Sequence, residues 1–275
     1  PVAEEREAPP GERLEQLFYK KRELNEKALI IYLCAGYPDL EFSRDLILTA
    51  VKAGADIVEV GIPFSDPLAD GPVIQHASQQ ALSKGMNAAK AVELAAEIKK
   101  CVSIPLLIMS YYNPLYRYGL EEFCRDAYEA ELNGIIVPDL PLEESEMMVS
   151  LTRNFGLGFV PLVSPTSPLE RLKKISSTAL GFIYCISTTG TTGSTLRSFK
   201  DAESVAEELR RITPKPIALG FGIEGPEHVL KVSPLYDGVI VGSAVIRIIE
   251  RFKNNREFCL KEVGAFIASL KKACI

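Results

Sequence analysis

The stretch LIIYLCAGYPDLEFSRDLILTAVKAGADIVEVG, residues 29–61, decides the fold class. It holds two short apolar runs rich in β-branched residues, 29–34 and 57–61, which flank a stretch with the amphipathic period of a helix, 40–53. Apart from Glu59, both runs are continuously apolar instead of alternating, which is typical of strands buried on both faces of a parallel sheet. Asp39 is the expected N-cap of the helix and Gly54 its stop.

This strand–helix pattern recurs along the whole chain. Strands are predicted at 29–34, 57–61, 105–110, 134–137, 158–163, 182–186, 216–220 and 238–241, which makes eight. Helices are predicted at 14–25, 40–53, 88–101, 120–130, 143–155, 169–176, 202–211, 226–232, 244–251 and 257–272, with another from about Pro72 and with Ser167 and Gly156 as further helix-end signals. Eight βα units without a strand-only block predict a single (β/α)8 TIM barrel with an extra N-terminal helix. A doubly wound open sheet is the main alternative, because one false strand would change the count.

Chain length and composition fit one barrel domain. Single α/β barrels have about 250 residues, and no Pro/Gly/Ser-rich linker divides these 275 residues. We expect residues 1–10 to be a disordered tail and residues 11–275 to form one catalytic domain. The net charge of -5 offers no basic surplus for nucleic acid, and no apolar run approaches the roughly 18 residues of a membrane span. Six scattered cysteines without a C-x-x-C pair argue against a disulfide framework or a zinc site and suit a reducing cytoplasm or plastid.

Acidic residues are the candidates for proton transfer. Glu59 interrupts the second predicted strand near its C-terminal end, where barrel enzymes carry their active residues. It either forms a structural ion pair or has its pKa raised by apolar surroundings into the range useful for proton transfer. The loop that follows contains two more acids, Asp66 and Asp70. Asp66 is either a turn residue or functional, Asp70 is either a helix N-cap or functional, and their spacing does not decide between these roles. His76 and His228 are predicted to be surface or packing residues, so a Ser–His mechanism has no support.

Glycine-rich segments follow the last three predicted strands. They are STTGTTGS (187–194), GFGI (220–223) and Gly242-Ser243 before a helix. Barrel enzymes often bind phosphate at the loops after strands seven and eight, on backbone N–H groups and a helix N-terminus. The second and third segments therefore predict a phosphate site, with plain turns as the alternative. Residues 187–198 are either a lid over the substrate or an idle surface loop.

Taken together, these motifs resemble the alpha subunits of tryptophan synthase, in family order and over about residues 14–273. The most specific is EVGIPFSDPLADGP (59–72), and the others are SYYNP (110–114), VPDLP (137–141) with EES (143–145), GTTG (190–193), GFGI (220–223) and GSA (242–244). The resemblance implies a retro-aldol-type cleavage of indole-3-glycerol phosphate to indole and glyceraldehyde 3-phosphate, without a metal or organic cofactor. It also implies an alpha2beta2 complex with a pyridoxal-phosphate beta subunit, and this beta subunit receives the indole.

The same resemblance implies roles for individual residues. Glu59 would transfer protons, Asp70 would hold the indole N–H, and Tyr184 would lie near the substrate glycerol. The expected binding residues are Tyr32 and Tyr111 in the wall of the indole pocket, Thr192 against Asp70 when the lid shuts, and the amides around Gly193, Phe221, Gly222, Gly242 and Ser243 for the phosphate.

Three positions depart from the family pattern. Thr191 replaces a usual valine, Thr188 an arginine of some members, and Tyr32 a common phenylalanine. The two threonines put lid closure and coupling to a partner in question, while both acids are retained. Three alternatives remain: another phosphate-handling barrel such as an indole-glycerol-phosphate synthase or a sugar-phosphate isomerase, a stand-alone lyase that releases indole, and a weakly active chain that mainly activates a beta subunit.

Overall fold

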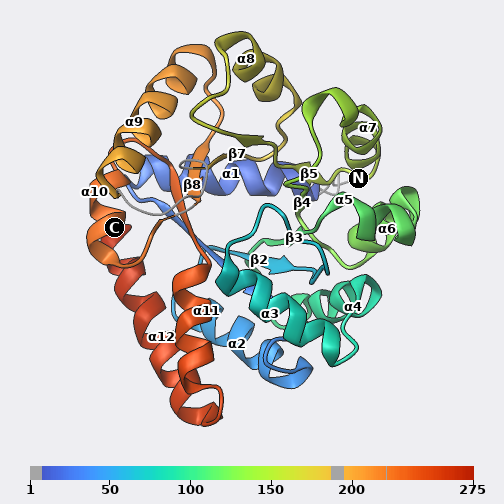
Figure 1. Cartoon of the computed structure of the whole chain (residues 1–275). Coiled ribbons are helices and arrows are strands. Elements are labelled where there is room, and N and C mark those ends of the chain that lie inside the picture. The colour runs from blue at the N-terminus through green and yellow to red at the C-terminus, as the bar shows by residue number, and fades with distance from the viewer. Residues whose placement is uncertain (1–7, 187–194, 221) are drawn as a thin grey trace, which may run out of the picture.

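The computed structural model describes residues 8–186, 195–220 and 222–275. Its strands form one parallel sheet in the order β5-β4-β3-β2-β1-β9-β8-β7-β6 (Figure 1). They are β1 (Ala28–Cys34), β2 (Ile57–Gly61), β3 (Leu106–Met109), β4 (Gly134–Ile136), β5 (Gly158–Phe159), β6 (Leu162–Val163), β7 (Ile183–Ile186), β8 (Ile217–Gly220) and β9 (Gly238–Val241).

The two ends of this order belong to one strand of the barrel. β5 and β6 flank Val160 and Pro161, and together these residues fill the predicted strand 158–163. Pro161 has no N–H to donate, which interrupts the regular ladder. Hydrogen bonds continue on both sides, from the Val160 N–H to the Ile135 carbonyl at 3.1 Å and from the Tyr184 N–H to the Pro161 carbonyl at 3.0 Å. The sheet therefore closes as an eight-stranded (β/α)8 barrel, and the open-sheet alternative is wrong.

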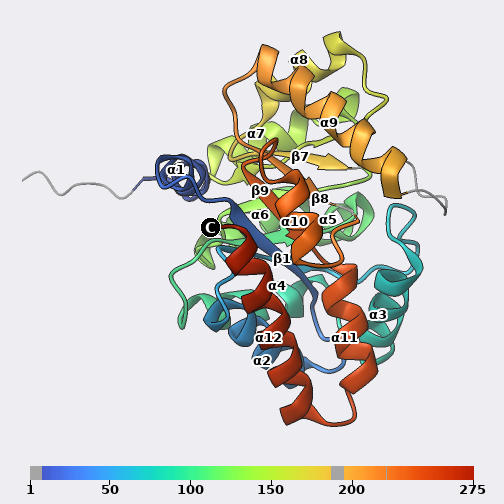
Figure 2. The same cartoon turned by 90° about the vertical axis from the view of Figure 1, so that its left-hand side faces the viewer.

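Helices surround the barrel in the order in which they follow its strands (Figures 1 and 2). They are α2 (Leu40–Lys52), α3 (Pro72–Ser83), α4 (Ala88–Lys99), α5 (Tyr112–Tyr118), α6 (Leu120–Glu129), α7 (Glu146–Asn154), α8 (Leu169–Thr178), α9 (Thr195–Ile212), α10 (Pro226–Val232), α11 (Ser243–Phe252) and α12 (Arg256–Ala273). Three features differ from the prediction. Helix α5 was not expected, and the helix predicted at 143–155 is divided into a 3-10 turn, Leu142–Glu144, and α7. Helix α9 begins at Thr195 and not at the predicted residue 202, so residues 195–198 of the predicted lid are helical.

Three of the four residues predicted to mark helix ends, Asp39, Gly54 and Gly156, are confirmed. The Asp39 carboxylate accepts a hydrogen bond from the Phe42 N–H at 2.8 Å and caps α2, as predicted. Gly54 and Gly156 follow the ends of α2 and α7 with φ of 104° and 68°, the left-handed backbone that suits glycine. Ser167 is not an N-cap, because Pro168 occupies that position and the Ser167 hydroxyl instead accepts from the Ser164 N–H at 3.2 Å.

The extra N-terminal helix, α1 (Pro10–Glu23), closes the end of the barrel at which the strands begin. Leu14 and Phe18 are fully buried in a cluster with inward-facing strand residues, and the Phe18 and Phe182 rings lie 5.1 Å apart. Arg22 holds the buried Asp237 carboxylate with two hydrogen bonds, at 2.6 and 2.8 Å. Because this end is filled, the described part of the barrel is open only toward the C-terminal ends of its strands.

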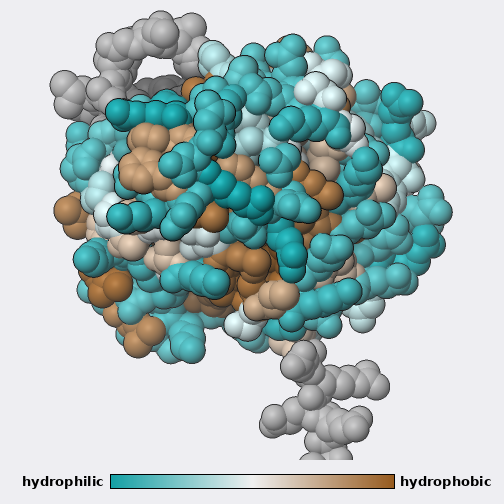
Figure 3. Space-filling model, turned by 90° about the horizontal axis from the view of Figure 1, so that it is seen from below, coloured by the Kyte–Doolittle hydropathy of each residue, from teal (hydrophilic) through white to brown (hydrophobic). Residues whose placement is uncertain are grey.

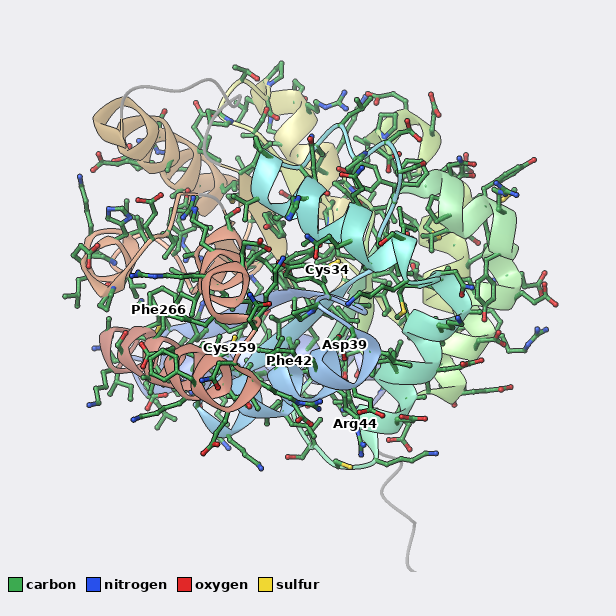
Figure 4. All side chains as sticks on the ribbon, turned by 60° about the horizontal axis from the view of Figure 1, so that its bottom comes forward. Cys34, Asp39, Phe42, Arg44, Cys259 and Phe266 are labelled. Carbon is green, nitrogen blue, oxygen red and sulfur yellow. The ribbon has the colours of Figure 1, made fainter. Side chains whose placement is uncertain are left out.

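A second apolar layer lies between the sheet and the ring of helices. Figure 4 labels part of it, with Phe42 from α2 and Cys259 from α12 near the contact between these helices. The face in Figure 3 mixes hydrophilic residues with separate hydrophobic patches. All six cysteines are free and five of them are buried, as predicted. Within the described residues, no helix is both long and apolar enough to cross a membrane.

Candidate active site

A cavity of about 330 Å³ opens at the C-terminal ends of the strands. Side chains and backbone from β1, β3, β6, β7, β8 and β9 form its floor and sides, and the segments after β2, β4, β8 and β9 form its rim. The lining residues are Tyr32, Ala69, Asp70, Gly71, Ile74, Met109, Pro138, Leu162, Tyr184, Ile186, Gly220, Gly222, Ile223, Glu224, Ile240, Gly242, Ser243, Ala244 and Arg247. The cavity therefore brings together most of the described residues that the sequence singled out.

Glu59 lies on β2, one layer deeper than the cavity. The strand register sets it beside Tyr32 on β1 and Leu107 on β3, and the alternation of β2 makes it face inward with Ile57 and Gly61. Its side chain is fully buried, and neither carboxyl oxygen has a hydrogen-bond partner among the described residues. Burial raises the pKa of this carboxyl to about 8. The structural ion pair that the sequence left open is therefore not formed within the described part of the chain.

Two tyrosine–glycine pairs shape the floor of the cavity. A Cβ atom on Gly61 would lie 2.3 Å from the Tyr32 hydroxyl oxygen, and one on Gly220 would lie 2.2 Å from the Tyr184 hydroxyl oxygen. Only glycine at these two strand positions leaves room for the phenol rings. Both rings thus cover the inner surface of the barrel, and Tyr32 covers β2 directly above Glu59.

Glu59 and Asp70 both raise the pKa of the same two phenols, Tyr184 and Tyr32. Burial, followed by the charges of Glu59 and Asp70, raises the pKa of the Tyr184 hydroxyl well above its ordinary value. Burial raises the pKa of the Tyr32 hydroxyl too, with Cys34, Asp70 and Glu59 as the next contributions. Glu59 and Asp70 are therefore both close to Tyr32 and Tyr184. Glu59 approaches the two phenols from β2 below them, and Asp70 approaches them from the rim above.

Asp70 lines the rim between β2 and α3. It does not cap α3, because Gly71 is the N-cap residue and no side-chain cap is formed there within the described structure. Burial raises the pKa of the Asp70 carboxyl to about 6, and a hydrogen bond with Tyr111 opposes this shift. The Tyr111 hydroxyl also accepts from the Ala69 N–H at 2.9 Å, which fixes the loop. Asp66 is exposed and its carboxylate accepts from the Ser65 hydroxyl, so of the two loop acids only Asp70 faces the cavity.

Gly222, Gly242 and Ser243 meet on the opposite side of the cavity. Gly222 has a φ of 75°, which favours glycine, and Ser243 is the first residue of α11. Gly242 is the N-cap, and within the described chain no side chain caps this helix end, so its N–H groups are available to an anion. Phe221, Thr192, Gly193, Thr188 and Thr191 lie outside the described residues, as does residue range 187–194 of the predicted lid.

The structure adds residues that the sequence did not single out. Apolar side chains from five elements, Ile74, Met109, Leu162, Ile186 and Ile240, form much of the cavity wall. Inward alternation at the strand ends would have found most of them. Glu224 and Arg247 also line the cavity, and neither belongs to a recognisable motif. The His76 and Gln80 side chains form a hydrogen bond on α3, and the His228 ring accepts a hydrogen bond from the Glu224 N–H. These contacts agree with the surface or packing roles predicted for both histidines.

This arrangement suits acid–base chemistry on an apolar substrate that carries an anionic group. The cavity wall is mainly apolar, one acid below the cavity has a raised pKa, a second acid stands at its rim, and an uncapped helix end also lines it. Within the described residues, no group of His, Cys, Asp and Glu could hold a metal ion.

Comparison with known proteins gives a consistent result. The family model for the tryptophan synthase alpha chain matches residues 18–275. A tryptophan synthase alpha chain from Carboxydothermus hydrogenoformans is 47% identical over 244 residues, which cover 89% of this chain and 91% of that one. The one from Prochlorococcus marinus is 41% identical over 94% of this chain and 97% of its own.

Solved structures agree in fold over nearly the whole chain. Tryptophan synthase subunit alpha from Legionella pneumophila superposes with a TM-score of 0.88 at 33% identity, over 95% of this chain and 98% of that chain. A Mycobacterium tuberculosis tryptophan synthase structure gives a TM-score of 0.87 at 31% identity, over 98% of this chain and 99% of that chain.

Proposed function

Because the chain belongs to the tryptophan synthase alpha chain family, we propose that the cavity at the open end of its barrel is where the family's reaction takes place. Enzymes of this family are carbon–carbon lyases of tryptophan biosynthesis that cleave indole-3-glycerol phosphate, and this chain is one of them. The observation that carries the proposed site is Glu59, a fully buried carboxyl without a hydrogen-bond partner among the described residues. Residues 11–275 are the proposed catalytic domain, and residues 1–10 the proposed tail.

Glu59 transfers both protons of the cleavage. Indole C3 must gain a proton before its bond to the glycerol chain becomes labile, and the glycerol hydroxyl next to that bond must lose one as the aldehyde forms. With its pKa raised to about 8, the carboxyl is mostly protonated at neutral pH and donates to C3. The carboxylate that remains then accepts the hydroxyl proton, which restores the acid for the next turnover.

Asp70 and Tyr184 stabilise the two ends of the changing charge. The Asp70 carboxylate accepts a hydrogen bond from the indole N–H and stabilises the positive charge that develops on the ring after protonation at C3. Such a fixed charge in a largely apolar cavity contributes on the order of 10²–10³ in rate. The Tyr184 hydroxyl points toward the glycerol part of the substrate, and its position near both acids supports this role.

The remaining residues hold the substrate. The phosphate lies on the amides of Gly222, in the loop after β8, and of Gly242 and Ser243 at the start of α11, where the helix dipole favours an anion. Tyr32, which lines the cavity, and Tyr111, which is buried beside Asp70 without lining the cavity, are the proposed walls of the indole pocket. Gly193, Phe221 and Thr192 are proposed to complete the phosphate site and the lid on the basis of the sequence motifs alone.

The alpha chains of this family work with a beta subunit. We further propose that this chain forms an alpha2beta2 complex, in which the indole passes to the beta subunit, and that it acts in the cytoplasm, or in a plastid if the source is a plant. Assays of the chain alone and with a beta subunit separate the alternatives. Strong activation by the beta subunit indicates a coupled subunit, high activity alone indicates a free lyase, and no activity in either assay indicates a scaffold for the beta subunit.

The Glu59→Gln variant tests the site. Indole release from indole-3-glycerol phosphate should nearly vanish, because the amide neither donates an acidic proton nor accepts one, while binding of the substrate in calorimetry should persist. Asp66→Asn is the matched control, because Asp66 is exposed on the same loop and outside the cavity. Full turnover by Glu59→Gln would rule out the proposed site.

A further inference from the structure

The cavity has an unusual balance of charge for a site that takes a phosphate ester. Among the described residues that line it, Asp70 and Glu224 are acids and Arg247 is the one cation. A phosphate monoester carries a charge of about -1.5 to -2 at pH 7, whereas a helix N-terminus offers only about half a positive charge. The amides at the start of α11 therefore leave most of the phosphate charge unbalanced, and Arg247 is the described group that can balance it.

Arg247 is placed where it can reach the phosphate. It lies four residues after Ser243, one turn along the same face of α11. Side chains of a helix lean toward its N-terminus, so the guanidinium extends back toward the uncapped end of α11. Arg247 and Ser243 both line the cavity, which agrees with this geometry.

In the described structure, the arginine is engaged by an acid from the neighbouring loop. Arg247 Nη2 lies 3.4 Å from Glu224 Oε1, and Glu224 follows the Gly222 turn after β8. This ion pair thus joins the loop after β8 to α11, the two segments that hold the proposed phosphate site. The side chains are 51% and 57% exposed, and exposed ion pairs of this kind are weak. A phosphate, which an arginine can bind through two parallel hydrogen bonds, is the stronger partner.

We propose that Arg247 is a specificity-determining residue that binds the substrate phosphate, and that Glu224 is its internal competitor. This inference rests on the proposed function of the cavity and adds a side-chain ligand to it. When the substrate enters, the guanidinium exchanges the Glu224 carboxylate for the phosphate. Glu224 weakens binding in two ways, since it occupies the arginine in the empty site and repels the phosphate in the filled one.

The test compares four proteins, each complete and assayed with the same beta subunit: the wild type, Arg247→Gln, Glu224→Gln and Arg251→Gln. Arg251 is the matched control, because it is an exposed arginine one turn further along α11 that contacts the Phe252 ring and is not part of the cavity lining. The probes are indole-3-glycerol phosphate for turnover, glycerol 3-phosphate for the phosphate subsite and indole for the apolar pocket.

The expected results have opposite signs for the two partners. Arg247→Gln should raise KM and weaken glycerol 3-phosphate binding about tenfold or more, with kcat within about twofold and indole binding unchanged. Glu224→Gln should strengthen glycerol 3-phosphate binding severalfold and lower KM. Arg251→Gln should match the wild type in all assays.

Two results would overturn the inference. One is an Arg247→Gln variant that binds glycerol 3-phosphate as tightly as Arg251→Gln does. The other is a Glu224→Gln variant that binds it more weakly than the wild type, which is the result expected if the ion pair only shapes the loop. Failure of the proposed function looks different: the wild type itself would then neither bind glycerol 3-phosphate nor cleave indole-3-glycerol phosphate.

Discussion

Replacing Glu59 by Gln should make the protein more stable in alkaline solution at the same time as it removes cleavage. Burial raises the pKa of this carboxyl from 4.5 to about 8. A difference of about 3.5 pH units corresponds to about 5 kcal/mol, at roughly 1.4 kcal/mol for each unit. The folded wild-type protein therefore bears up to about this cost when Glu59 is ionised, and the glutamine variant never bears it.

The sign of the pH dependence follows from where the proton is held. Below pH 4.5 the carboxyl is protonated in the folded and unfolded states, so it adds no pH dependence. Between 4.5 and about 8 the unfolded state releases the proton and the folded state keeps it, so the contribution of Glu59 to the free energy of unfolding falls as pH rises. Above about 8 both states are ionised and the full penalty applies.

Urea unfolding followed by far-UV circular dichroism at pH 5 and pH 9 measures this contribution. The stability of Glu59→Gln relative to the wild type should increase by several kcal/mol between the two pH values. Glu97→Gln, an exposed change on α4, should follow the wild type at both. If Glu59→Gln and the wild type lose stability in parallel from pH 5 to pH 9, then Glu59 is not a buried acid with a raised pKa and the proton-transfer argument loses its basis.

Three further changes test separate parts of the structure. Burial raises the pKa of Asp70 to about 6, so kcat/KM of the wild type should rise through that pH as the carboxylate forms; Asp70→Asn should lower kcat/KM on the order of 10²-fold and remove this limb of the pH profile, and a limb that persists would assign it to another group. Gly61→Ala should cost about 1–3 kcal/mol in urea unfolding and raise KM, because its Cβ would lie 2.3 Å from the Tyr32 hydroxyl oxygen; wild-type values for both would contradict the tight packing. Asp237→Asn should lower the free energy of unfolding by about 3 kcal/mol, because this buried carboxylate holds Arg22 of α1 and Arg210 of α9. It should leave kcat unchanged, because Asp237 lies at the closed end of the barrel; a loss of kcat without a loss of stability would contradict this separation of the two ends.

Much of the fold could be predicted because each barrel strand is a short run that is buried on both faces. Such runs stay apolar from end to end, and Gly or Asp residues at the helix ends separate them from the helices. The interruption at Pro161 was not predicted, because the apolar pattern of 158–163 is continuous and the missing N–H matters only once the neighbouring strands are in place. Helix α5 was missed for a different reason: it is short and rich in tyrosine, so it has no apolar stripe of helical period.

The candidate site could be predicted only in part. A single carboxylate in an apolar strand drew attention to Glu59 on physical grounds. Spacing did not choose between Asp66 and Asp70, because both are loop aspartates; the family resemblance implied Asp70, and in the structure Asp70 lines the cavity while Asp66 is exposed. Glu224 and Arg247 were not singled out, because neither belongs to a motif and no local pattern indicates that their two side chains form an ion pair at the cavity.

The two ends of the barrel divide the conflicting demands of stability and chemistry. At the closed end, Leu14 and Phe18 of α1 fill the interior with apolar side chains, and such packing can offset the cost of one buried acid. At the open end, the phenol of Tyr32 lies over Gly61 and so covers the strand directly above Glu59. Since desolvation alone raises the pKa of Glu59, this cover is part of the reason why the acid is protonated near neutral pH. A smaller side chain at position 32 should therefore admit water and lower that pKa, so the residue that shapes the indole pocket also sets the acidity of the group that protonates the indole.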